Sequence, residues 1–128
     1  LFGAVVCTYP LLDMVRYHQF LVASFWVPEY GSSEDPEQFA YILDYSPYHN
    51  VDEMARYPAT LYITGDGDTR VAPLHARKMA ALMQATHGDA TPILLRYHTD
   101  AGHSGGQPVS QQIEEMVDTV SFLLWQVG

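Results

Sequence analysis

The chain has 128 residues, of which 48% are hydrophobic and 12% aromatic. The length suits one domain and is too short for two, and the apolar content argues against a disordered chain. The formal net charge of −9 at pH 7 leaves no basic surface for a nucleic-acid backbone or an anionic membrane, so neither partner is expected.

The first half of the chain predicts one strand followed by two helices. Residues 3–7 form a short Val-rich run, which is typical of a strand covered on both faces. Residues 13–25 carry apolar side chains at steps of three or four, so we expect a helix with Asp13 as its N-cap. A second helix is predicted over residues 35–45, because Asp35 is a preferred N-cap residue.

The second half predicts alternating strands and helices. We expect strands over residues 59–64 and 92–97, and helices over residues 73–86 and 110–126. One stripe of the last helix is apolar: Ile113, Met116, Val117, Val120, Leu123 and Leu124. The order β-α-α-β-α-β-α is typical of an α/β fold with a mostly parallel sheet flanked by helices.

The chain begins at Leu1 with neither an initiator Met nor a signal-peptide pattern, so we expect it to be a piece of a larger protein. Its apolar runs fall short of the ~20 residues that a membrane-spanning helix needs, which favours a soluble protein, cytoplasmic or periplasmic. Cys7 is the only cysteine and predicts no internal disulfide.

Two loops after predicted strands carry most of the reactive side chains. Asp66, Asp68 and Arg70 follow one strand, and His103 follows the next. Neighbouring strands lie ~4.8 Å apart, so Asp68 and His103 can come within hydrogen-bond range. An Asp that holds a His is the orienting half of a nucleophilic triad. The chain has no G-x-S-x-G elbow, so in a hydrolase the nucleophilic Ser would lie upstream of Leu1.

Four segments in this order, residues 26–31, 45–51, 68–75 and 101–108, resemble the end of the catalytic domain of the prolyl oligopeptidase family. The resemblance covers essentially the whole chain. Members of that family are serine peptidases whose α/β-hydrolase domain is capped by a β-propeller, and they cleave short peptides after proline. The resemblance implies a partial α/β-hydrolase fold, with the nucleophile half and the propeller outside residues 1–128.

The resemblance also implies roles for individual residues. Asp68 and His103 match the Asp and His of the catalytic triad, and Arg70 matches an arginine that binds a substrate carbonyl. Trp26 matches the indole on which the substrate proline packs, and Tyr30 matches a tyrosine of the same pocket. The aliphatic lining of that pocket matches Leu11, Val22 and Val71. No metal or organic cofactor is implied.

Two alternatives from other classes remain open. Asp66 and Asp68 resemble the nucleophile loop of haloacid-dehalogenase-type phosphatases, and a non-catalytic structural subdomain is the second alternative. As part of a peptidase, the chain would act on short proline-containing peptides and would be inactive alone. Its partner would be the remainder of the same enzyme, or it would self-associate through the unpaired edge of its first strand.

Overall fold

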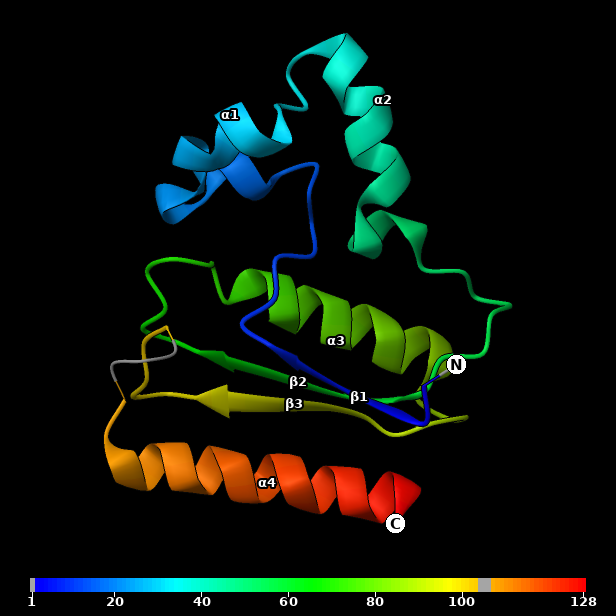
Figure 1. The fold of residues 1–128 in the computed structure, drawn as a ribbon. Helices are drawn as coiled ribbons and strands as arrows, with labels where there is room; N and C mark the ends of the chain where they lie inside the picture. Colours follow the sequence, from blue (N-terminus) through cyan, green and yellow to red (C-terminus); the bar gives the residue numbers. More distant parts are fainter. Residues whose placement is uncertain (1, 104–106) are drawn as a thin grey trace.

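The computed structural model describes residues 2–103 and 107–128, and a parallel sheet lies at its centre. The strands β1 (Ala4–Thr8), β2 (Ala59–Gly65) and β3 (Ile93–His98) pair in the order β1-β2-β3 (Figure 1). All three predicted strands are confirmed, and so is the α/β class. β1 and β3 each pair with β2 alone, so each is an edge strand of the described sheet.

Helices cover both faces of this sheet. The helix α3 (Leu74–His87) lies on one face, and α4 (Val109–Val127) lies on the other (Figure 1). Side chains of β2 alternate between the two sides: Tyr62 packs among residues of α3, whereas Leu61 and Ile63 share a core with Phe122 of α4. This burial on both sides explains why β2 is apolar along its length.

A helical segment between β1 and β2 lies beyond α3, on the side away from the sheet (Figure 1). It contains α1 (Val27–Tyr30) and α2 (Pro36–Tyr45). It also contains three short 3-10 helices: Tyr17–Gln19, Leu21–Trp26 and Pro47–Asn50. The Asp35 side chain accepts hydrogen bonds from the first backbone N–H groups of α2, which confirms the predicted N-cap.

The single helix predicted over residues 13–25 is wrong. Phe20 is extended and Leu21 has a φ of +51°, so the chain forms two 3-10 helices in place of one α-helix. Apolar residues spaced by three suit 3-10 geometry as well, because that helix has 3.0 residues per turn. Asp13 does not cap a long helix, and its carboxylate instead binds Arg16 and Lys78.

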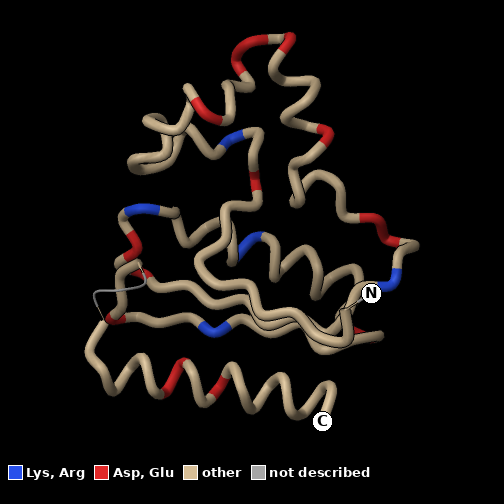
Figure 2. The backbone as a smooth tube through the Cα atoms, in the orientation of Figure 1, with Lys and Arg blue, Asp and Glu red and all other residues tan. Residues whose placement is uncertain are grey.

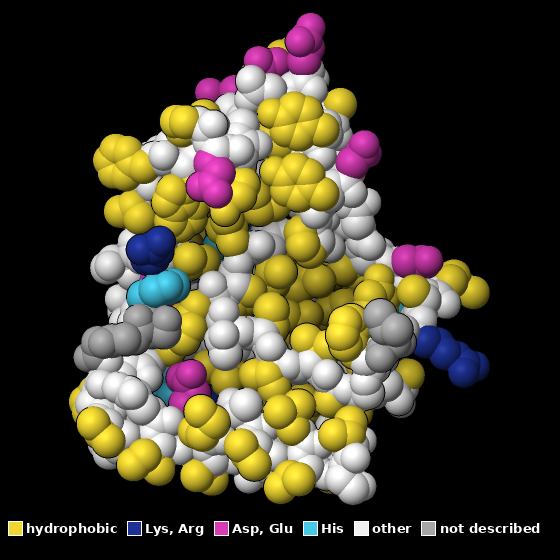
Figure 3. Space-filling view, in the orientation of Figure 1, with side chains coloured by type: hydrophobic (Ala, Val, Ile, Leu, Met, Phe, Trp, Pro, Cys, Tyr) yellow, Lys and Arg dark blue, Asp and Glu magenta, His cyan; other side chains and the backbone are white. Residues whose placement is uncertain are grey.

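The predicted last helix is confirmed as α4, but its apolar stripe faces away from the sheet except at Leu123, which packs against the core that contains Phe122. Phe122 is the buried residue of α4, and Figure 3 shows hydrophobic side chains along the outside of this helix. The exposed apolar residues of α4 are Val109, Ile113, Met116, Val117, Val120, Leu124, Trp125 and Val127. Acidic residues are spread from the helical segment to α4, as Figure 2 shows. Within the described residues, no helix is both long and apolar enough to cross a membrane.

Candidate active site

The loops that follow β2 and β3 are joined by backbone hydrogen bonds. The N–H of Asp66 donates to the carbonyl of His98 (2.8 Å), and the N–H of Gly67 donates to the carbonyl of Ala101 (3.0 Å). Gly65 permits this approach, because a Cβ at that position would lie 2.3 Å from the Ala101 oxygen. The two loops are therefore held together at the carboxyl edge of the sheet.

Asp68 and His103 meet where these loops converge. The Asp68 side chain is buried, and its Oδ2 lies 2.8 Å from Nδ1 of His103. Its other oxygen, Oδ1, accepts hydrogen bonds from the N–H groups of Arg70 (2.8 Å) and Val71 (2.9 Å). A carboxylate at Nδ1 favours the imidazole tautomer with its proton on that nitrogen. Nε2 is then the atom of His103 that can accept a proton.

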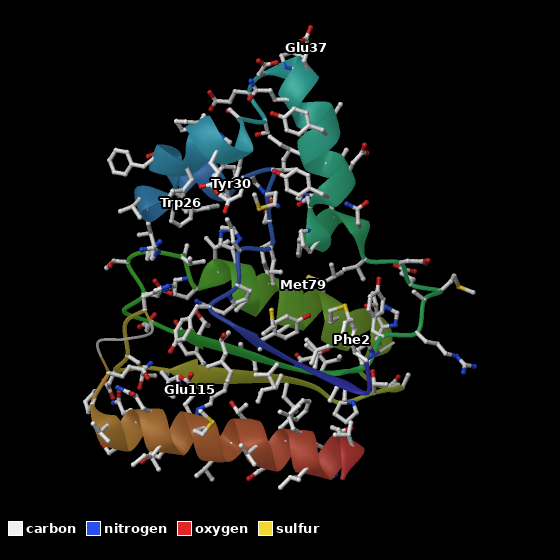
Figure 4. The ribbon with its side chains drawn as sticks, viewed as in Figure 1. Phe2, Trp26, Tyr30, Glu37, Met79 and Glu115 are labelled. Carbon is white, nitrogen blue, oxygen red and sulfur yellow. The ribbon has the colours of Figure 1, made fainter. Side chains whose placement is uncertain are left out.

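A small cavity lies next to the residues that Asp68 binds. It has a volume of about 230 Å³, and its lining residues are Leu11, Trp26, Glu29, Tyr30, Arg70 and Val71. The Arg70 guanidinium carbon lies 6.0 Å from the centroid of the Trp26 ring, at the outer limit of a cation–π contact. Figure 4 shows Trp26 and Tyr30 next to each other on the side of the helical segment that faces α3.

Most of the residues predicted for substrate binding line this one cavity, but Val22 does not. Val22 is 40% exposed and is absent from the lining. Glu29 also lines the cavity and was not predicted to do so. Its position next to Tyr30, a predicted pocket residue, could have indicated this. Tyr9 was also missed, and its ring lies 5.2 Å from that of His103.

A buried charge cluster holds the helical segment, and with it Trp26, against α3. Asp13 is fully buried, and its carboxylate binds Arg16 and Lys78, the latter from α3. Burial opposes ionisation of Asp13, but the hydrogen bond and charge of Lys78, together with Arg16, lower its pKa below the usual range. The backbone N–H of Asp13 donates to Nδ1 of His75 (3.1 Å), and burial lowers the pKa of His75 to about 4. His75 is therefore neutral at pH 7.

The two aspartates of the loop after β2 have separate partners. Asp66 is exposed and accepts a hydrogen bond from the Tyr97 hydroxyl (2.5 Å), whereas Asp68 is bound to His103. In the described part of the chain, no three His, Cys, Asp or Glu residues are grouped so that they could hold a metal ion. The geometry gives the two carboxylates no shared ligand.

A parallel α/β sheet whose consecutive loops bring a buried Asp to a His has the arrangement in which α/β-hydrolases hold two members of their catalytic triad. The chain belongs to the prolyl oligopeptidase family, whose model matches residues 1–128. It is 42% identical over 119 residues to the prolyl endopeptidase of Elizabethkingia miricola. It is 36% identical over 128 residues to prolyl oligopeptidase A of Amanita bisporigera. These alignments cover 92% and 99% of the chain.

Solved structures give the same result. A chain from a structural and mechanistic analysis of two prolyl endopeptidases superposes with a TM-score of 0.93 at 50% identity, and the match covers 98% of the present chain. Prolyl oligopeptidase B from Galerina marginata superposes with a TM-score of 0.92 at 33% identity over 99% of the chain. The chain spans about 17% of the length of the curated relatives and about 18% of these two solved chains. Membership of a peptidase family also removes the support for the phosphatase alternative.

Proposed function

We propose that residues 1–128 are the C-terminal part of the α/β-hydrolase domain of a serine peptidase that cleaves short peptides on the carboxyl side of proline. The hydrogen bond between Asp68 and His103 carries this proposal, because it joins an orienting carboxylate to a base at the expected edge of the sheet. The nucleophilic Ser and the β-propeller belong to the rest of the enzyme, which fits the small share of each relative that this chain spans.

In this proposal His103 moves the proton and Asp68 stabilises the charge that results. Nε2 of His103 accepts the proton of the serine hydroxyl as the serine attacks the prolyl carbonyl, and then delivers it to the leaving amine. The imidazolium that forms is compensated by the buried carboxylate of Asp68, 2.8 Å from Nδ1. A water molecule then gives a proton to Nε2 of His103 as it attacks the acyl-enzyme ester, and the ester bond to the serine breaks to release the second product.

The cavity beside Asp68 is proposed to bind the substrate proline. The flat face of Trp26 suits the rigid pyrrolidine ring, because the two rings bury apolar area at a low cost in conformational entropy. Tyr30, Leu11 and Val71 complete the apolar wall. The Arg70 guanidinium lines the same cavity, and its fixed donors suit a backbone carbonyl of the substrate. Glu29 adds a carboxylate to the lining.

Substitutions made in a related enzyme support a Ser, His and Asp mechanism. Structures of the Galerina marginata enzyme bound to hydrolysis or macrocyclization substrates include one in which a serine is replaced by alanine. Others carry the same replacement at a histidine or at an aspartate. These replacements concern the same three residue types that we assign to the reaction.

The remainder of the enzyme is the proposed partner of the uncovered apolar surface. The outer face of α4 exposes many apolar side chains, and β1 has an unpaired edge in the described sheet. Exposed apolar faces and open sheet edges favour association. We expect the separate 128-residue chain to bind the rest of the enzyme or itself, and a monomer at high concentration in light scattering would contradict this.

The test of the proposed function uses the full-length enzyme. Replacing His103 by Ala should abolish cleavage after proline while the unfolding midpoint stays near that of the wild type, because the side chain is 29% exposed. Normal turnover by this variant would contradict the proposal and favour a structural subdomain. The 128-residue chain alone should not react with a fluorophosphonate probe, because it lacks the proposed nucleophile.

A further inference from the structure

Tyr9 is a buried aromatic residue next to the candidate site and has no role in the mechanism above. It follows β1 directly, and its backbone N–H donates to the carbonyl of Ile63 in β2 (2.8 Å). Its φ of +48° lies in the left-handed region, which non-glycine residues adopt rarely and only where their surroundings hold them. The contacts that hold Tyr9 therefore indicate its role.

The ring of Tyr9 packs against the imidazole of His103. The two ring centroids are 5.2 Å apart, and the ring planes are inclined by 57°. Asp68 holds the same imidazole at Nδ1 from the loop after β2. A hydrogen bond at one nitrogen still allows the ring to tilt about that bond, and an aromatic ring packed against it restricts this motion. The two contacts together define the direction of Nε2.

The hydroxyl of Tyr9 binds both the loop that carries His103 and the helix α4. Nε2 of Gln107, four residues after His103, donates to the Tyr9 oxygen (2.5 Å). The Tyr9 hydroxyl donates in turn to Oε2 of Glu115 (3.1 Å), which projects from α4 toward the sheet in Figure 4. One side chain thus connects the end of β1 to the loop that carries His103 and to the helix α4 that follows it.

Burial and a neighbouring negative charge keep the Tyr9 hydroxyl protonated. Burial, followed by the neighbouring Glu115 carboxylate, raises the pKa of Tyr9 to about 12. Glu115 itself lies 3.3 Å from Nε2 of His98 on β3. A neutral phenol can donate one hydrogen bond and accept another, and both are used here.

We propose that Tyr9 is a positioning residue for His103: its ring sets the orientation of the imidazole, and its hydroxyl anchors the loop on which His103 lies. The inference rests on the proposed function, because Tyr9 acts on the reaction only through His103. Misplacing a catalytic group by about 1 Å can cost ~10²-fold in rate, so the effect belongs in kcat. Substrate binding at Trp26 and Arg70 should be little affected.

Tyr57 and His87 provide a matched control. Their ring centroids lie 4.8 Å apart with the planes inclined by 60°, and the Tyr57 hydroxyl accepts a hydrogen bond from the N–H of Asp52 (3.0 Å). This pair therefore reproduces the ring packing of Tyr9 on His103 with the same two residue types. Tyr57 precedes β2, so the pair lies toward the amino ends of the strands, away from the candidate site.

The experiment measures kcat and KM of the full-length enzyme on a short proline-containing peptide, with folding followed by thermal unfolding. Tyr9→Leu removes ring and hydroxyl and should lower kcat by ~10²-fold, with KM within about twofold of wild type. Tyr9→Phe keeps the ring and should recover most of the loss, leaving kcat about three- to tenfold low. Tyr57→Leu and Tyr57→Phe should leave kcat within about twofold, whatever they do to the unfolding midpoint.

The outcomes separate this inference from the function on which it rests. If the wild type cleaves after proline but both Tyr9 variants keep wild-type kcat, the positioning role is wrong and the peptidase assignment stands. An equal loss of kcat in Tyr57→Leu also overturns it, since the effect would then be general destabilisation. If Tyr9→Leu does not fold, Tyr9→Phe decides by the same criterion. If the wild type has no such activity, the proposed function and the role of Tyr9 fail together.

Discussion

Asp13 and Asp68 are both buried aspartates with a histidine beside them, yet their surroundings differ. Asp13 is 0% exposed, and its carboxylate binds the ammonium of Lys78 and the guanidinium of Arg16. Asp68 is 3% exposed, and it binds two backbone N–H groups and the imidazole of His103. Within the described residues, no Lys or Arg forms an ion pair with Asp68.

This difference separates a structural carboxylate from one suited to catalysis. The charge of Asp13 is already neutralised by two cations, and these ion pairs hold the helical segment against α3. The carboxylate would therefore stabilise a further positive charge only weakly. The charge of Asp68 is stabilised only by hydrogen bonds, and an imidazolium at His103 would complete the pair. Burial near a histidine is therefore not sufficient to mark a triad aspartate, and the absence of a competing cation is the more informative feature.

The largest effect expected from this comparison is on catalysis. Asp68→Asn in the full-length enzyme should lower kcat by ~10⁴-fold, because an amide at Nδ1 favours the wrong imidazole tautomer. The amide oxygen can still accept from Arg70 and Val71, so the unfolding midpoint should change little. Steady-state kinetics and thermal unfolding of the same preparation measure both quantities. A kcat within tenfold of wild type would remove Asp68 from the triad.

The matching substitution at Asp13 should affect stability instead. Asp13→Asn leaves Lys78 (21% exposed) and Arg16 (49% exposed) without their shared anion, and because water can reach both cations the loss of unfolding free energy should be about 2 kcal/mol. The kcat per folded molecule should stay within about tenfold of wild type, because Asp13 does not contact His103. Denaturant titration and active-site titration separate the two. A kcat loss as large as that of Asp68→Asn would show that the two aspartates do not differ as proposed.

A smaller effect is expected in the pH dependence of stability. Burial lowers the pKa of His75 to about 4 from its ordinary value of 6.5, so the unfolded chain takes up a proton between these values and the folded chain does not. Stability therefore falls as the pH drops through this window, and His75 should contribute a loss of about 2 kcal/mol between pH 7 and pH 5. The lowered pKa of Asp13 does not add here, because its stabilising effect is lost only below about pH 4.

The measurement is a comparison of the wild-type enzyme with His75→Asn, whose Oδ1 takes the place of Nδ1 as acceptor for the N–H of Asp13 and does not titrate. The difference in unfolding free energy between the two proteins should shift in favour of His75→Asn as the pH falls from 7 to 5. A constant difference over this range would mean that His75 is not held neutral by its burial.

The sequence was sufficient to predict the strands and the contact between Asp68 and His103, because both follow from local pattern and from sheet geometry. An apolar β-branched run predicts a strand, and consecutive parallel strands end at one edge. The spacing of apolar residues over 13–25 could not separate an α-helix from 3-10 turns, since the break depends on φ at Leu21. The stripe on α4 predicted a helix, but a stripe does not specify which surface will cover it.

Residues that act through tertiary contacts were the ones that sequence reasoning missed. In the sequence, Tyr9 is simply the residue at which a predicted strand ends. Its proposed role depends on Gln107 and Glu115, about one hundred residues away. Asp13 was predicted to be an N-cap from its neighbours in sequence. Its partner Lys78 lies 65 residues further along the chain, on α3, and cannot be inferred from the local sequence. Val22 matched a pocket residue of the family, but the segment that holds it leaves its side chain exposed. The local sequence pattern predicts helices and strands, whereas polar partners that are distant in the sequence become known only from the three-dimensional structure.

The smallest expected effect tests the other aspartate of the same loop. Asp66→Asn should leave kcat and KM within about twofold of wild type, because Asp66 is exposed. Its carboxylate accepts a hydrogen bond from the Tyr97 hydroxyl, and an amide oxygen can accept the same bond. Kinetics on the same peptide used for Asp68→Asn measure the effect, and a comparable loss would contradict the assignment of roles. Because Asp66 and Asp68 lie two positions apart in one loop, the pair of variants shows whether activity depends on a carboxylate at this edge of the sheet or on the carboxylate that holds His103.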